Sequence, residues 1–221
     1  LAKLEKEIPS GNDWIFEIKY DGYRIIANIE NGKVKLYTRN FLDYTKKFPV
    51  IVQQLSNQFS AKSVILDGEI VCPDEKGRSD FGALQSYLKN SSGNEVSYMI
   101  FDILALDGKD LRTLPLLERK KLLKNVLKGA KGNLKESEYV RGHGEECFSA
   151  VKKLGLEGIV GKKVDSKYSG KRNGDWIKIK SYNRQEFIIC GYTLSDKKAG
   201  IGALILGAKK SNKYVYVGRA G

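Results

Sequence analysis

The chain has 221 residues, and its 39 Lys and Arg against 26 Asp and Glu give a formal net charge of +13. With 41% apolar and 29% charged residues the composition is that of a globular protein, which excludes disordered and collagen-like chains. No segment reaches the roughly 20 apolar residues of a membrane-spanning helix, and the first residues are too charged for a signal peptide, so no membrane partner is expected. The three cysteines lie far apart and form no disulfide framework, so we expect a reducing, cytoplasmic setting. The basic excess favours a polyanionic partner.

The first part of the chain predicts an antiparallel meander. Trp14–Ile18 and Tyr23–Glu30 have the pattern of short strands. Asn31-Gly32 is a strong signal for a two-residue hairpin, and it connects the second strand to Lys33–Arg39. Alternation in that last segment predicts one buried and one exposed face.

Helices and further strands follow. Apolar residues at helical spacing, including Ile51 and Leu55, predict a helix that begins near Pro49. The other predicted helices are Phe81–Lys89, Leu116–Leu127 and Glu146–Leu154, and the other strands are Val64–Cys72, Val96–Leu104, Gly158–Val164 and Asp175–Lys180. The basic face of the helix at 116–127, which carries Arg119 and Lys120, is expected to be solvated.

Beyond Ser181 the pattern changes to strands without a helix. These strands are predicted at Glu186–Leu194, Ile201–Leu206 and Lys213–Val217. Three strands cannot close a small barrel, which needs about five. We therefore expect the sequence to be a piece of a longer chain that ends within a second domain.

The most informative segment is Glu17-Ile18-Lys19-Tyr20-Asp21-Gly22-Tyr23-Arg24. Lys19 follows a predicted strand and is followed by Asp-Gly, so it lies at the mouth of a turn. A lysine becomes a nucleophile only when its ammonium loses a proton, and burial and nearby cations lower its pKa. A lysine in such a place could attack a carbonyl carbon or a phosphorus atom. The alternative is an exposed hairpin lysine.

Three carboxylates lie within apolar strand-like runs. Asp67 and Glu69 belong to Leu66–Val71, and Asp102 belongs to Tyr98–Leu104. An acidic group in such a run is costly unless it has a partner, so partners are expected. The alternative is a tight Asp67-Gly68 turn that leaves Glu69 exposed.

Basic residues accumulate towards the end of the first domain. Alternation in Trp176–Lys180 places Lys178 and Lys180 on one face, and two adjacent ammoniums repel unless an anion lies between them. Eight basic residues occur against two acidic ones, namely Lys162, Lys163, Lys167, Lys171, Arg172, Lys178, Lys180 and Arg184 against Asp165 and Asp175. This density favours contact with a phosphate backbone without sequence specificity.

Taken in order, these motifs resemble the covalent nucleotidyltransferases, which comprise ATP-dependent DNA ligases, RNA ligases and mRNA capping enzymes. The chain is most similar to the ligase domain of the bacterial multifunctional DNA end-joining ligases. The resemblance implies an α+β, ATP-grasp-like fold over residues 1–184, in which antiparallel sheets flanked by helices form a nucleotide-binding cleft. Residues 185–221 would then begin an all-β OB-fold domain.

The resemblance also implies roles at the nucleotide. Lys19 matches the residue whose amine attacks the α-phosphorus of ATP and takes up AMP. Glu17 and Ile18 match positions along the adenine edge, Arg24 matches a ribose or phosphate contact, and Phe101 in Tyr98–Leu104 matches the aromatic residue that stacks on the purine.

The remaining matches concern phosphate and metal. Arg39, in Tyr37–Asn40, would bind the nucleotide or the 5′-phosphate of a nick. Glu69 would bind the ribose hydroxyls and, with Glu157 of Leu156–Lys163, a Mg²⁺ or Mn²⁺ ion. Lys178 and Lys180 would bind the α-phosphate.

The implied reaction transfers AMP from the lysine to a DNA 5′-phosphate, which the 3′-hydroxyl then attacks to seal the nick. Nicked double-stranded DNA and other end-joining repair proteins or domains are the implied partners. The family's sixth motif, which orients pyrophosphate, is not found, so sealing of a pre-adenylated nick is expected to survive better than self-adenylation.

Four other functions share part of this pattern. A capping guanylyltransferase would use GTP and an RNA ligase would use ATP, with the same lysine chemistry. An NAD-dependent ligase would need a zinc-binding cluster, which three scattered cysteines cannot supply. A non-catalytic nucleic-acid-binding module would gain nothing from Glu69 and Glu157 beside phosphate. The single histidine, His143, argues against a Ser-His-Asp triad.

Overall fold

The computed structural model describes residues 1–59, 61–90, 95–181, 186–195 and 200–221. The chain forms two compact units, Leu1–Ser181 and Tyr182–Gly221. The predicted domain boundary at residues 184 and 185 lies outside the described residues. No described helix is both long enough and apolar enough to span a membrane.

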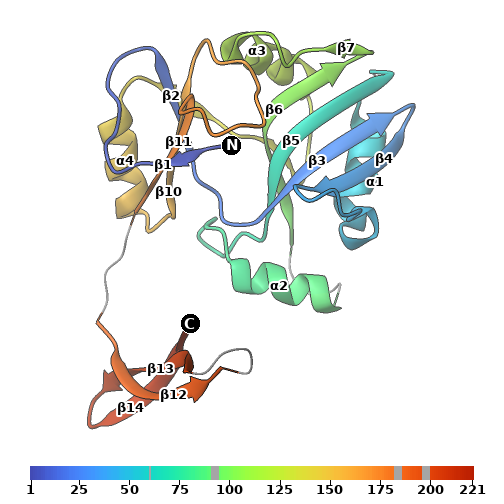
Figure 1. Ribbon diagram of the computed structural model, residues 1–221. Helices are drawn as coiled ribbons and strands as arrows, with labels where there is room; N and C mark the ends of the chain where they lie inside the picture. Colours follow the sequence, from blue (N-terminus) through green and yellow to red (C-terminus); the bar gives the residue numbers. More distant parts are fainter. Residues whose placement is uncertain (60, 91–94, 182–185, 196–199) are drawn as a thin grey trace. The chain divides into compact units, whose positions relative to one another are not determined.

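The first unit contains a five-stranded sheet that closes one side of the fold (Figure 1). Its strands, in spatial order, are β1 (Lys3–Leu4), β11 (Trp176–Lys180), β10 (Gly158–Lys163), β2 (Trp14–Ile18) and β9 (Tyr139–Arg141). Only the pairing of β1 with β11 is parallel. Helix α4 (Gly144–Lys153) contributes Val151 to a core shared with Phe16, Ile159 and Ile177 of this sheet.

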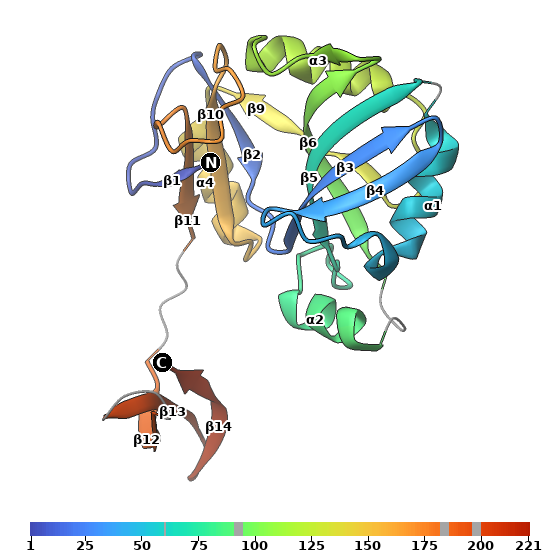
Figure 2. The same ribbon diagram turned by 45° about the vertical axis from the view of Figure 1, so that its right-hand side comes forward.

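A second sheet has six strands and carries the larger core. Its strands are β4 (Lys33–Thr38), β3 (Tyr23–Glu30), β5 (Ser63–Val71), β6 (Ser97–Leu106) and β7 (Lys109–Asp110), with β8 (Leu134–Glu136) parallel to β6. The helices around it are α1 (Pro49–Gln58), α2 (Phe81–Asn90) and α3 (Leu116–Val126). A short 3₁₀ helix, η1 (Thr45–Lys47), comes directly before α1. Figure 2 shows the two sheets facing each other within this unit. The predicted α+β fold with antiparallel sheets and flanking helices is confirmed.

The hairpin of β3 and β4 follows directly from its sequence. Asn31 and Gly32 both have positive φ, 47° and 75°, as a two-residue hairpin turn requires. Glu30 therefore pairs with Lys33, and Val34 falls on the buried face. The turn thus fixes the register that carries β4 towards Arg39.

Helix α1 forms where the apolar spacing and Pro49 predict it. Proline is tolerated at the first helical position, where its missing N–H would have no partner in the helix. Ile51 and Leu55 are fully buried one turn apart, and each contributes roughly 1.5–3 kcal/mol through burial.

The prediction for the basic face of α3 is wrong at two residues. Arg119 and Lys120 are buried, and Arg119 donates from Nε and Nη2 to Asp102 at 2.8 and 2.9 Å. Lys120 Nζ lies 2.7 Å from Glu17. Acidic groups on β6 and β2 draw these two cations inward, whereas Lys121 is exposed as expected.

The second unit is an antiparallel sheet of three strands. They are β12 (Ile188–Leu194), β13 (Ile201–Lys210) and β14 (Lys213–Ala220), in that spatial order. All three lie where strands were predicted, and β13 and β14 extend further than the sequence pattern indicated.

Candidate active site

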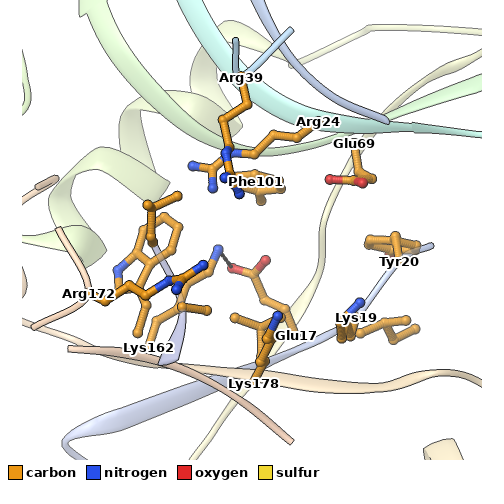
Figure 3. Close-up of a pocket in the computed structure, with 15 residues that line it drawn as sticks. Glu17, Lys19, Tyr20, Arg24, Arg39, Glu69, Phe101, Lys162, Arg172 and Lys178 are labelled. Atoms are coloured by element: carbon orange, nitrogen blue, oxygen red, sulfur yellow. Dashed lines mark hydrogen bonds and ion pairs between the residues drawn. The ribbon is translucent and has the colours of Figure 1, made fainter. Parts of the chain in front are cut away.

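A cavity of about 260 Å³ lies between the two sheets of the first unit. Eight of the ten predicted site residues line it, namely Glu17, Ile18, Lys19, Arg24, Arg39, Glu69, Phe101 and Lys178. Figure 3 shows Arg24, Arg39 and Phe101 on one side of the cavity and Lys19, Lys162 and Lys178 on the other. The fold thus brings together most of a site whose members are up to about 160 residues apart in sequence.

Lys19 lies directly after β2 and is held by both its backbone and its side chain. Its N–H donates to the carbonyl of Gly158 at 2.9 Å. Its Nζ lies 2.5 Å from Oε2 of Glu157, and the other oxygen of Glu157 lies 3.5 Å from Nζ of Lys180. The expected nucleophile and one expected metal ligand therefore contact each other.

Glu157 and Lys180 lie outside the lining of the first cavity. Glu157 instead lines a second cavity of about 250 Å³, together with Lys19, Asp21 and Arg78. Burial, and then the charge of Glu157, raise the pKa of Asp21. Lys19 lines both cavities and so connects them.

Gly22 explains why a glycine follows Lys-Tyr-Asp in this turn. A Cβ at this position would lie 2.1 Å from the carbonyl oxygen of Ile70 on β5. No side chain can be accommodated against backbone at that distance, so only glycine lets the start of β3 lie against β5. This close approach fixes the backbone of the turn between Lys19 and Arg24.

Asp67 has the partner that its position in an apolar strand requires. Arg24 donates to its two oxygens at 3.0 and 2.6 Å, and the hydroxyl of Tyr168 donates to it at 2.7 Å. Asp67 is fully buried, whereas Arg24 still reaches the cavity. This network fixes the guanidinium group of Arg24 at the cavity wall, and the alternative of a turn that exposes Glu69 is wrong because β5 is continuous.

Phe101 presents an apolar ring to the cavity from β6. The guanidinium carbon of Arg24 lies 5.3 Å from the centre of the ring, and Nζ of Lys162 lies 4.5 Å from it. Trp176 contacts Phe101 edge-on, with 6.2 Å between ring centres. A flat ring beside cations suits a purine carrying phosphates.

Glu17 is buried in a cluster with two lysines. Lys120 and Lys162 lie 2.7 and 2.9 Å from Oε1, and the hydroxyl of Ser137 donates to Oε2 at 2.9 Å. Burial opposes the ionisation of Glu17, but the two lysines outweigh it and hold its pKa below the usual range. Two cations share one carboxylate, so the cluster makes this wall of the cavity electropositive.

The buried ammonium of Lys162 predicts a pH dependence of stability. Burial lowers its pKa to about 8, against the attraction of Glu17. From pH 8 to about 10.4 the unfolded lysine holds a proton that the folded one has lost, so the free energy of unfolding rises with pH in this window. Thermal unfolding across the window should show that Lys162→Met loses this rise, whereas Lys163→Met at a more exposed position keeps it. Equal pH slopes for the wild type and Lys162→Met would contradict the assignment.

Several cations complete the cavity wall. Burial, and then the nearby Lys19 and Lys180, lower the pKa of Lys178. Arg172 also lines the cavity, and the sequence indicated it only as part of a basic stretch. Tyr20 was missed as well; burial, and then Glu17, raise its pKa to about 12. The cavity therefore combines one aromatic surface with an excess of positive charge, which suits a nucleotide.

Comparison with known proteins decides the family. The sequence profile described as "ATP dependent DNA ligase domain" matches residues 1–180. The chain belongs to this family. The ligase domain is 39% identical, over its whole length, to the multifunctional non-homologous end joining protein LigD of Pseudomonas aeruginosa, of which it spans 27%.

Two further relatives support the assignment. A DNA ligase-like protein, LigB, of Bacillus subtilis is 35% identical over 87% of this chain and 70% of its own length. A solved structure of mycobacterial DNA ligase D complexed with ATP and MES has a TM-score of 0.74 and 31% identity, and the match covers all of this ligase domain and 71% of that chain. The chain thus spans about a quarter of the length of its LigD relatives.

The expected metal ligands of the ligase domain, Glu69 and Glu157, are of the type that Mg²⁺ and Mn²⁺ bind. Burial raises the pKa of Glu69 to about 8, although Arg24 opposes this. Its carboxylate has no ion pair among the described residues, so a cation beside it would relieve an uncompensated cost. No group of three or more His, Cys, Asp or Glu side chains gathers in the described part of the chain. In phosphoryl-transfer sites Mg²⁺ commonly takes one or two carboxylates, with substrate phosphates and water as further ligands.

The basic stretch of the ligase domain is not uniformly exposed. Lys162 is buried in the Glu17 cluster, so the prediction that it contacts a phosphate backbone is wrong. Lys167, Lys171 and Arg172 are exposed. Arg184 lies outside the described residues.

Proposed function

We propose that this ligase domain seals breaks in DNA through a lysine–AMP intermediate on Lys19. The observation that carries the proposal is that Lys19, which contacts Glu157, also lines a cationic cavity together with the half-buried ring of Phe101. ATP is supported as the nucleotide by the family profile and by the ATP complex of a structural relative.

In the first step, Nζ of Lys19 attacks the α-phosphorus of ATP. A nitrogen–phosphorus bond forms and the bond to the bridging oxygen of pyrophosphate breaks. Glu157 Oε2, 2.5 Å from Nζ, takes the proton that the amine releases. Lys178 and Lys180 neutralise the charge of the α-phosphate. Phe101 stacks on adenine, and Glu17 and Ile18 border the base. Arg24 and Arg39 bind the ribose or the phosphates, which holds ATP in place for the attack. A divalent cation held by Glu69 and Glu157 would supply further charge neutralisation at the phosphates.

In the second step an oxygen of the DNA 5′-phosphate attacks the phosphorus of lysine–AMP, the nitrogen–phosphorus bond breaks, and Lys19 is released as the amine. In the third step the 3′-hydroxyl attacks the phosphorus of the 5′-phosphate, and AMP leaves. Exposed cations at 167–172 support contact with the DNA backbone without sequence specificity. The names of the LigD relatives support a role in end joining. We propose that the protein acts there with other end-joining repair proteins or domains, in the bacterial cytosol. We further propose that the unit at Tyr182–Gly221 is part of an OB-fold domain.

The test uses the full-length protein with a divalent cation and nicked duplexes. ATP labelled in its α-phosphate should give acid-labile label on the protein, and nicked DNA should be sealed. Label from GTP instead would identify a capping enzyme, and sealing confined to RNA nicks would identify an RNA ligase. Tight binding of nucleic acid with neither label nor sealing would identify a non-catalytic binding module.

A further inference from the structure

Tyr168 lies in the connection between β10 and β11, outside the lining of the candidate active site. It is half-buried, and its backbone N–H donates to the carbonyl of Arg112 at 2.9 Å. Its ring contacts Trp176 edge-on, with 5.9 Å between ring centres, and the guanidinium carbon of Arg119 lies 6.0 Å from its centre. The position of the ring is therefore set by packing and does not depend on its hydroxyl group.

The hydroxyl group of Tyr168 bridges Arg24 and Asp67. It accepts a hydrogen bond from Nη2 of Arg24 at 3.2 Å and donates to Oδ2 of Asp67 at 2.7 Å. Burial, and then the charge of Asp67, raise the pKa of Tyr168, so the hydroxyl keeps its proton and remains a donor. Arg24 and Asp67 lie on β3 and β5 of the six-stranded sheet, whereas Tyr168 follows β10 of the five-stranded sheet. The hydroxyl therefore connects the two sheets that enclose the cavity.

Arg24 has five N–H groups, and this network leaves two of them for a ligand. Nε and Nη2 donate to Asp67 at 3.0 and 2.6 Å, and Nη2 also donates to Tyr168. Nη1 donates to none of the residues that the structure describes, and Arg24 lines the cavity (Figure 3). The three occupied N–H groups fix the plane of the guanidinium group, so the direction in which Nη1 offers its protons is fixed as well.

We propose that Tyr168 is a positioning residue, whose hydroxyl group holds the guanidinium group of Arg24 in place for the nucleotide. The inference rests on the proposed function, in which Arg24 binds the ribose or the phosphates of ATP. Lys19 directly follows β2 of the five-stranded sheet, and Tyr168 ties Arg24 to that same sheet. The hydroxyl thus fixes where the nucleotide lies relative to the attacking amine. A donor held in its bound orientation also binds a ligand without first being ordered.

The test is Tyr168→Phe in the full-length protein, which keeps the ring and removes only the hydroxyl group. Binding is measured by titration calorimetry with a divalent cation and an ATP analogue whose α- and β-phosphorus are joined by a methylene group, so that it cannot react. The affinity should fall roughly ten-fold, as when one hydrogen bond to a charged group is lost. Tyr98→Phe is the matched control, because the buried Tyr98 hydroxyl donates to the carbonyl of Ile25 at 2.8 Å and lies outside the cavity lining. This control should bind the analogue like the wild type.

A second pair of variants separates positioning from a general loss of structure. Arg24→Lys keeps a cation opposite Asp67 but removes the planar guanidinium group. Adding Tyr168→Phe to Arg24→Lys should change the affinity by less than about two-fold, because no guanidinium group is left to position.

Three results would overturn the inference: wild-type affinity in Tyr168→Phe, an equal loss in Tyr98→Phe, or the full loss on adding Tyr168→Phe to Arg24→Lys. The measurement requires no catalysis. A wild type that binds the analogue but forms no lysine–AMP from ATP would therefore refute the proposed function, while the affinities of the variants would still decide the role of Tyr168.

Discussion

Replacing Lys19 by arginine is expected to abolish lysine–AMP formation and to lower ATP-dependent sealing by roughly a thousand-fold or more. Arginine keeps the positive charge that faces Glu157. Its guanidinium group does not lose a proton in proteins and is therefore no nucleophile. The measurement is the rate of sealing of a nicked duplex with ATP.

The same variant should retain sealing of a nick that already carries AMP on its 5′-phosphate, because the lysine adduct is then bypassed. Lys163→Arg is the matched control, since Lys163 pairs with Asp175 outside the cavity. If the sealing rate fell equally on the unmodified and the pre-adenylated nick, Lys19 would support the structure of the site and would not be the nucleophile. Unchanged sealing with ATP would remove Lys19 from the reaction.

Arg119→Met is expected to lower the free energy of unfolding by about 3–5 kcal/mol. The pair of Arg119 with Asp102 is fully buried on both sides. Burial raises the pKa of Asp102 even though Arg119 opposes this rise. Without Arg119 the ionised Asp102 carboxylate would therefore be still more costly to keep buried. The measurement is unfolding in urea.

The double variant Arg119→Met with Asp102→Leu should recover most of the loss, because no charge is then left buried. Arg112→Met breaks a pair of similar length that is exposed, with Asp110, and should cost at most about 1 kcal/mol. If Arg119→Met and Arg112→Met lowered the free energy of unfolding by the same amount, burial of the Arg119–Asp102 pair would not be what makes its loss costly.

Most of the fold could be predicted because its strands are long enough to show a pattern. The β3–β4 hairpin is specified locally by alternation and by Asn31-Gly32. β7, β8 and β9 could not be predicted, because segments of two or three residues become strands only through pairing with a neighbour.

Much of the candidate site was visible as ordered motifs, and the structure shows why. Lys19 directly follows β2, Arg24 lies on β3 and Phe101 lies on β6, and all three side chains line one cavity between the two sheets. The roles of Lys120 and Lys162 could not be predicted, because helical and strand spacing identify apolar faces but not the distant carboxylate that draws a lysine inward. A buried acidic residue such as Glu17, which must have a partner, was the available signal.

The most direct test of the central claim is to locate the AMP. The full-length protein is incubated with ATP and a divalent cation, and its peptides are analysed by mass spectrometry under conditions that preserve the phosphoramidate bond. We expect one adduct, with the mass of AMP, on Lys19 and no trypsin cleavage after it. An adduct on a different lysine, or nucleotide retained only without a covalent bond, would contradict the account.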